Sequence, residues 1–174
     1  TLHAWEQAFG YYPHPSDDYN GFGVIYNLDT IGYSSNDNLP IYAVKLSANA
    51  NLMEAQPKVL ILGQCHAEEI YGVEISMKMI YQFLHPEQFQ ENRTFLQKGL
   101  YFTEIWIVPT YNPEGLRVVH GEVGNGIQDV TYRKNKRDVN NNGIFDYIAG
   151  VGQDIDGVDL NRNYDFNWSF GDTL

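Results

Sequence analysis

The chain has 174 residues, a length that fits one domain. Hydrophobic residues make up 43% and charged residues 19%, so the sequence can build a core and lacks the composition of a disordered chain. The 22 acidic residues outnumber the 11 lysines and arginines, and the formal net charge is −11. This charge disfavours nucleic acids and anionic membranes as partners. No apolar run approaches the roughly 18 residues of a membrane span.

Three segments have the sequence character of β-strands. Residues 41–47 alternate between apolar and polar positions, whereas residues 59–62 form a continuous apolar run that is typical of a strand covered on both faces. Residues 101–109 are rich in aromatic and β-branched side chains and end in proline. We therefore expect three strands in these positions.

Between the second and third strands, residues 68–84 have the apolar spacing of a helix that packs on a sheet. Apolar side chains recur at intervals of three or four residues, and His85-Pro86 ends the pattern. The order strand, helix, strand predicts an α/β layer, in which ligands usually bind outside the carboxyl ends of the strands. His66 follows such an end. From Gly121 onward Gly, Asn and Asp predominate, so we expect long loops there.

His66 and Glu69 lie three residues apart, and both can point at one metal ion. Zinc in hydrolytic sites takes imidazole and carboxylate ligands and commonly has three protein ligands with water in the fourth position. The pair is therefore a candidate for two of the three ligands. The alternative is structural: Glu69 complements the positive end of a helix, and His66 only terminates a strand.

Further motifs follow in a fixed order. They are GQCHAEE at 63–69, PTYNPEG at 109–115, YRKNKR at 132–137 and GVDLNRNYD at 157–165, preceded by TIGYSSNDNLPIYAVKLS at 30–47. Together these motifs resemble the zinc metallocarboxypeptidases related to carboxypeptidase A. The resemblance implies an α/β fold with a mixed, mostly covered sheet flanked by helices. It also implies that residues 1–174 form the N-terminal portion of a single catalytic domain that is incomplete at its C-terminus.

The resemblance implies zinc-dependent hydrolysis of C-terminal peptide bonds, with peptide and protein C-termini as substrates. His66 and Glu69 match zinc ligands, and Asp159 matches a carboxylate that orients the histidine ligand through its other ring N–H. Arg133 matches the arginine that polarises the scissile carbonyl and stabilises the oxyanion.

Asn161 and Arg162 match the residues that bind the terminal carboxylate, and a guanidinium beside an amide suits that role because it forms bidentate, charge-assisted hydrogen bonds. The neighbouring charges Lys134, Lys136 and Arg137 are expected to lie on the surface.

The sequence departs from the family pattern in two ways. Glu68 stands where relatives of the carboxypeptidase A type carry arginine, which argues against recognition of acidic peptides. In the family, the third zinc ligand, a capping tyrosine and the general-base glutamate come later than residue 174. We therefore expect the C-terminal remainder of the same domain as a partner, and weak metal binding and little hydrolysis from this chain alone.

Residues 138–146 have the spacing of a calcium loop. Positions one, three, five and nine carry side-chain oxygens, glycine stands at six, and the residue at seven can offer its carbonyl; the candidate ligands are Asp138, Asn140, Asn142, Ile144 and Asp146. Position twelve lacks an acid, although Asp154 or Asp156 could close the shell. The alternative is an Asn/Gly-rich turn without an ion. Extracellular calcium would suit the loop, and we expect a secreted or periplasmic protein.

Two other functions are compatible with these motifs. A non-catalytic relative would keep carboxylate or peptide binding without turnover. An amidase of cell-wall peptides would keep the metal and the hydrolysis on the same scaffold with another substrate, because related scaffolds serve several reactions.

Overall fold

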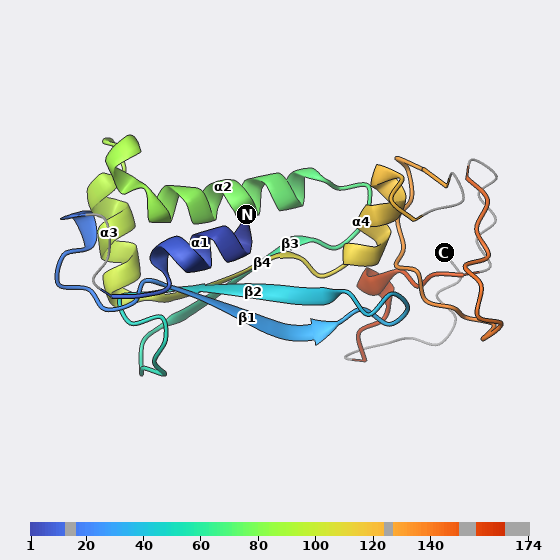
Figure 1. The fold of residues 1–174 in the computed structure, drawn as a ribbon, viewed down its shortest axis with the longest axis horizontal. Helices are drawn as coiled ribbons and strands as arrows, with labels where there is room; N and C mark the ends of the chain where they lie inside the picture. The colour runs from blue at the N-terminus through green and yellow to red at the C-terminus, as the bar shows by residue number, and fades with distance from the viewer. Residues whose placement is uncertain (13–16, 124–126, 150–155, 166–174) are drawn as a thin grey trace. The chain divides into compact units, whose positions relative to one another are not determined.

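The computed structural model describes residues 1–12, 17–123, 127–149 and 156–165 (Figure 1). The chain is divided into two compact units. Unit 1 comprises Thr1–Gly32, Ile41–Gly63 and Tyr71–Tyr111, and unit 2 comprises Tyr33–Pro40, Gln64–Ile70 and Asn112–Leu174. None of the helices in the described ranges has the length and apolar character needed to cross a membrane.

Unit 1 is built on a four-stranded mixed sheet. Its strands are β1 (Tyr26–Tyr33), β2 (Pro40–Leu46), β3 (Lys58–Gln64) and β4 (Glu104–Thr110), in the order β1-β2-β4-β3. Strands β2 and β4 are antiparallel, with Val44 opposite Ile107. The strands predicted at 41–47, 59–62 and 101–109 are confirmed as β2, β3 and β4, except that residues 101–102 end the preceding helix.

Three helices complete unit 1: α1 (Leu2–Phe9), α2 (Tyr71–Leu84) and α3 (Arg93–Phe102), with short 3-10 turns at Asp17–Tyr19 and Pro86–Gln88. Helix α2 runs along the sheet and packs mainly on β4 (Figure 1). Ile80 and Leu84 of α2 are fully buried in the same apolar core as Val44 and Ile107. The predicted stop is confirmed, because α2 ends at Leu84 before His85-Pro86.

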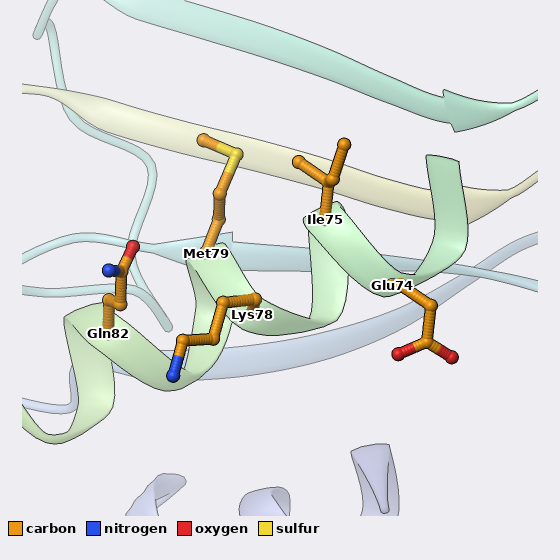
Figure 2. A pocket seen from close by; sticks show the side chains of 5 residues that line it. All are labelled: Glu74, Ile75, Lys78, Met79 and Gln82. Carbon is orange, nitrogen blue, oxygen red and sulfur yellow. The ribbon is translucent and has the colours of Figure 1, made fainter. Parts of the chain in front are cut away.

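Strand β3 does not meet the expectation of a strand covered on both faces. Val59, Leu60 and Leu62 are 46%, 63% and 49% exposed. The reason is topological: β3 is the last strand in the order, so in the described part of the chain only β4 pairs with it. Nearby, α2 also presents apolar surface, and five of its side chains line an open hollow of about 450 Å³ on successive turns (Figure 2): Glu74, Ile75, Lys78, Met79 and Gln82.

A charged cluster is buried inside unit 1. The Glu104 side chain is fully buried, and its oxygens lie 3.1 Å from Lys45 Nζ and 3.3 Å from Lys58 Nζ. Burial alone would raise the pKa of Glu104, but hydrogen bonds from Lys45, the Glu54 backbone N–H, Lys58 and Trp106 lower it to about 2. Glu104 is therefore ionised at neutral pH and compensates the buried charge of Lys45.

Unit 2 contains one α-helix and one 3-10 turn among its described residues: α4 (Pro113–His120) and η3 (Leu160–Arg162). Asn112 caps α4 by accepting the Gly115 N–H, Pro113 occupies the first turn, and Gly121 ends the helix at φ 75°. A small core holds Ala67, Val118, Val119, Tyr132 and Tyr147. The prediction of long loops after Gly121 is confirmed for the residues described there.

Candidate active site

A tight turn after β3 brings His66 and Glu69 together. The Glu69 N–H donates to the His66 carbonyl at 3.1 Å, and the Ile70 N–H donates to the Glu68 carbonyl at 3.0 Å. We expected this segment to open the helix, but α2 begins only at Tyr71. A turn, and not a helix, therefore places the side chains of His66 and Glu69 on the same side of the backbone.

The Nδ1 atom of His66 is placed as a metal ligand would be. It lies 3.1 Å from Glu69 Oε1, yet it is buried and has no hydrogen-bond partner in the described ranges, because the two groups are close but not aligned for a hydrogen bond. A buried nitrogen without a partner is costly, whereas a cation between the nitrogen and the carboxylate would satisfy both.

The opposite ring nitrogen of His66 faces Asp159. His66 Nε2 lies 3.2 Å from Asp159 Oδ1. Burial would raise the pKa of Asp159, but hydrogen bonds from Arg133 and from the Asn161 N–H, together with the charges of Arg133 and His66, lower it. The contact with ionised Asp159 needs the proton on Nε2 and leaves a lone pair on Nδ1, whereas Arg133 Nη2, 2.7 Å from Nε2, can donate only to an Nε2 without a proton. A metal on Nδ1 therefore requires the first tautomer, with Arg133 Nη2 turned away from Nε2.

Arg133 is held by three neighbours. Its Nε donates to Asp159 Oδ2 at 2.9 Å, its Nη1 donates to Glu68 Oε1 at 3.2 Å, and its Nη2 lies 2.7 Å from His66 Nε2. Burial would lower the pKa of Arg133, but the carboxylates of Asp159 and Glu68 raise it. The side chain is 40% exposed, and each Nη atom carries a second N–H, so the guanidinium can still reach a ligand.

These residues fit a divalent metal ion in chemistry and in charge. One imidazole nitrogen and one carboxylate oxygen are ligands that zinc takes in hydrolytic enzymes. Glu68 and Asp159 contact the Arg133 guanidinium and Glu69 lies at the His66 ring, so these three carboxylates outnumber the guanidinium and a dication would neutralise the excess negative charge. Within the described ranges, however, no group of three or more His, Cys, Asp or Glu side chains is placed to hold a metal ion.

Asn161 and Arg162 lie in η3, which begins at Leu160 just after Asp159, and both are exposed. Asp159 caps this turn: its Oδ1 accepts the Asn161 N–H at 2.9 Å, and its carbonyl accepts the Arg162 N–H at 3.0 Å. Asp159 thus contacts His66 through its carboxylate and fixes the backbone of Asn161 through the carboxylate and that of Arg162 through its carbonyl.

Asn112 is a residue whose role the motifs did not predict. Its Nδ2 donates to the carbonyls of Cys65 at 2.9 Å and Lys134 at 3.1 Å, and its Oδ1 accepts the Gly115 N–H at 3.1 Å. Asn112 therefore ties the His66 turn and the Arg133 segment to the start of α4. The signal in the sequence was the Asn-Pro pair, which is typical of a helix start but does not reveal the two other contacts.

The expectation that Lys136 lies on the surface is wrong. Lys136 is 5% exposed, and its Nζ donates to both oxygens of Asp37 at 2.8 and 2.9 Å. It also lies 5.3 Å from the ring of Phe145. The backbone N–H of Asp37 donates to Glu114 Oε1 at 2.6 Å, so this buried charge network joins three separate segments of unit 2.

The predicted calcium loop is exposed and closed by its own hydrogen bonds. Asp138 Oδ2 accepts the Gly143 N–H at 2.8 Å, and Asn142 Oδ1 accepts the Ile144 N–H at 2.8 Å. Gly143 has φ 80°, a conformation that favours glycine. Asp146 Oδ2 accepts the side-chain amides of Asn140 and Asn142 at 2.8 and 2.6 Å.

Of the two acids considered for closing the calcium shell, Asp156 is fully buried and accepts the backbone N–H groups of Val139 and Asp146. Asp154 lies outside the described residues. These contacts suit a turn without an ion as well as a loop that binds one, so calcium stays a prediction.

Comparisons with known proteins agree with the motifs. The zinc carboxypeptidase family matches residues 22–173. A zinc carboxypeptidase from Saccharothrix mutabilis subsp. capreolus is 29% identical over 146 residues, which cover 83% of this chain and 28% of that protein.

Two crystal structures share the fold. Thrombin activatable fibrinolysis inhibitor (TAFI) aligns with a TM-score of 0.63 and 17% identity over 96% of this chain and 33% of its own. Carboxypeptidase A from Helicoverpa armigera aligns with a TM-score of 0.63 and 19% identity over 98% of this chain and 33% of its own. The chain thus spans about a third of the length of these relatives. Because the family match covers most of its residues, the chain belongs to the zinc carboxypeptidase family.

Proposed function

We propose that the protein containing this chain hydrolyses C-terminal peptide bonds with the help of zinc, and that this chain supplies the first two ligands and the carboxylate-binding residues. The observation that carries the proposal is the state of His66: its Nδ1, beside Glu69, has no hydrogen-bond partner among the residues that the structure describes, and its Nε2 faces Asp159. Both features prepare the imidazole for a metal. Membership of the family supports zinc as that metal.

His66 Nδ1 and Glu69 would hold the ion. A bound zinc activates water at neutral pH and polarises a carbonyl. With the metal bound, Asp159 Oδ1 would accept the proton on His66 Nε2, its other oxygen accepts Arg133 Nε–H, and Arg133 Nη2 would turn from Nε2 toward the substrate. The remaining N–H groups of Arg133 would donate to the oxygen of the scissile carbonyl, where negative charge develops. Loss of one such donor typically costs about 3 to 4 kcal/mol of transition-state stabilisation.

Asn161 and Arg162 would bind the free carboxylate at the end of the substrate. An amide and a guanidinium next to each other can donate several hydrogen bonds to one carboxylate. Their backbone is fixed by Asp159, so the carboxylate site and the metal site share one anchor. This coupling would set the distance between the substrate terminus and the bond that is cut.

The missing third ligand and general base would come from the C-terminal remainder of the same domain. Two arguments support this partner. The chain spans about a third of its relatives' length, and β3 exposes apolar side chains at the end of the sheet. An exposed, apolar strand edge is a site where another strand can pair. Without that partner, two ligands would bind zinc weakly.

The carboxylate-binding role is tested with Arg162→Ala in the complete polypeptide. We expect KM for peptides to rise about 10- to 100-fold, since a hydrogen bond to a charged group contributes roughly 1.5 to 3 kcal/mol. Peptides with an amidated C-terminus should be hydrolysed poorly by the wild-type protein and be little affected by the substitution. Arg137→Ala, which removes an exposed charge of the same kind, is the matched control. Equal losses on free and amidated peptides would contradict the anchoring role.

The same assay separates the two alternative functions. A non-catalytic relative would bind free-carboxylate peptides in zinc-replete buffer without turnover. A cell-wall amidase would cleave muropeptides faster than linear peptides. We expect turnover of linear peptides to exceed that of muropeptides.

We further propose that the loop at 138–146 binds calcium and that the protein is exported. The spacing of Asp138, Asn140, Asn142 and Asp146 supports the proposal, and millimolar extracellular calcium matches the weak affinity of such modules. Calcium at 1–5 mM should slow proteolysis within the loop and raise the melting temperature, whereas Asp138→Asn should abolish both effects. If chelation changes neither proteolysis nor stability, the loop is a turn without an ion.

A further inference from the structure

We propose that Glu68 positions Arg133 and sets the charge preference of the site, so that peptides with a cationic or neutral side chain next to the scissile bond are favoured over peptides with an acidic one. This inference rests on the proposed function, because it concerns the same substrate. Glu68 is not a metal ligand in that proposal: it orients Arg133 by direct contact, and its charge acts on the neighbouring side chains of the substrate.

The ion pair between Glu68 and Arg133 is direct. Glu68 Oε1 lies 3.2 Å from Arg133 Nη1, and the two side chains are 27% and 40% exposed. With Asp159 on Nε, two carboxylates hold the guanidinium from two directions. A long arginine side chain has many rotamers, so two fixed acceptors select one orientation and leave the remaining N–H groups for a ligand.

The Glu68 carboxylate is only half compensated. Its Oε2 is buried and has no hydrogen-bond partner among the residues that the structure describes. Its ion-pair partner, Arg133, is shared with Asp159, and the next residue in the chain, Glu69, is also acidic. Even when a dication neutralises the cluster as a whole, Glu68 remains a local negative charge on the Arg133 side.

This charge would act on the substrate at short range. If Arg133 donates to the scissile carbonyl, then Glu68 and that carbonyl are bound to the same guanidinium and lie about 6 Å apart. The side chains that flank the scissile bond are then within a Debye length, which is about 8 to 10 Å at physiological salt. A cation in that region is attracted to Glu68 and a carboxylate is repelled.

The test uses the zinc-loaded complete polypeptide and three peptides that differ only in the residue before the last, which is Lys, Gln or Glu. The wild-type protein should cleave the Lys peptide with the highest kcat/KM and the Glu peptide with the lowest. Glu68→Gln should reduce the Lys-to-Glu ratio of kcat/KM by about tenfold, since the partly exposed charge acts at reduced strength. Glu122→Gln removes an exposed acid in the same unit and should leave the ratio unchanged.

A second readout does not depend on turnover. The affinities of the same peptides for the metal-free protein, measured by calorimetry, should follow the same order. Glu68→Gln should reduce the differences between these affinities. Glu68→Asp keeps the charge and should retain most of the ratio even if kcat falls for all three peptides. A Glu68→Gln protein that loses activity equally on the three peptides, with an unchanged binding order, overturns the inference.

The outcomes for the proposed function are separate. One outcome is cleavage that requires a free C-terminal carboxylate, while Glu68→Gln leaves the Lys-to-Glu ratio of kcat/KM unchanged. That result would contradict only the role of Glu68. Absence of both cleavage and carboxylate-dependent binding in the wild-type protein removes the proposed function, and the role of Glu68 with it.

Discussion

Different forces stabilise the interior of each of the two units. Unit 1 has an extended apolar core, in which side chains such as Ile80, Leu84, Val44 and Ile107 are fully buried, and a cluster of buried charges around Glu104. Unit 2 has a small core around Val118 and depends on hydrogen bonds that join separate loops. The difference suggests a division of tasks: apolar packing builds the scaffold, and polar contacts position the reactive groups.

Polar contacts suit a site built from loops because they are directional. An apolar contact fixes a side chain only approximately, whereas Asn112 accepts one N–H and donates two at defined distances. The same is true of Asp159, which contacts His66, Arg133 and the Asn161 backbone. Such contacts fix the positions of His66 and Arg133 without a large apolar core.

The largest effect is expected from breaking the buried charge cluster of unit 1. Glu104→Gln in the complete polypeptide leaves Lys45, which is 2% exposed, without its negative partner. Loss of one member of a buried ion pair typically costs about 3 to 5 kcal/mol. Urea unfolding followed by tryptophan fluorescence should show this loss in the free energy of unfolding. Glu74→Gln, which removes an exposed acid on α2, should change it by less than about 0.5 kcal/mol. Similar urea unfolding curves for Glu104→Gln and Glu74→Gln would contradict the structural role of Glu104.

Acid should weaken the same cluster. The pKa of Glu104 is lowered in the folded protein from 4.5 to about 2. Its contribution to stability is therefore complete above about pH 4.5 and is lost as the pH falls toward 2. The gap in unfolding free energy between the wild-type protein and Glu104→Gln should narrow over this range. A gap that stays constant would show that Glu104 is not the titrating group.

A smaller effect is expected from breaking the hydrogen bonds of Asn112 in unit 2. Asn112→Asp keeps an oxygen that can cap α4 but removes the two N–H donors to Cys65 and Lys134. Two lost hydrogen bonds correspond to about 2 kcal/mol. Hydrogen exchange should increase at 64–70 and 133–136, whereas the protection of α2 in unit 1 should not change. An equal increase in hydrogen exchange in both units would contradict the view that the contacts of Asn112 position only the reactive groups of unit 2.

The sequence predicted much of unit 1 because its signals are local. Apolar spacing located α2, and β-branched or apolar runs located β2, β3 and β4. Burial was harder to predict, because a continuous apolar run does not reveal whether a strand lies inside a sheet or at its end. Residues 59–62 show this, since they belong to β3 and are largely exposed. Helices α1 and α3 and strand β1 had no sequence prediction.

In unit 2, the motifs identified the residues but not their contacts. His66 and Glu69 were selected from their spacing, and Arg133 and Asp159 from a family resemblance; the structure places them around one imidazole ring or one guanidinium. The long-range contact between Asp37 and Lys136 could not be predicted, because the two residues are far apart in the sequence and a lysine in a basic run is usually exposed. Their functional roles remain predictions.

The most direct test of the central claim is the ligation of zinc by His66 in the complete polypeptide. Nitrogen NMR of the histidine ring reports which nitrogen binds the metal and which carries the proton, and calorimetry gives the affinity. We predict that zinc binds Nδ1 while Nε2 keeps its proton. We also predict that His66→Ala and Glu69→Gln abolish tight binding, and that Asp159→Asn weakens it about 10- to 100-fold. Zinc affinity that is unchanged by His66→Ala and Glu69→Gln, or a zinc-bound Nε2, would contradict the account.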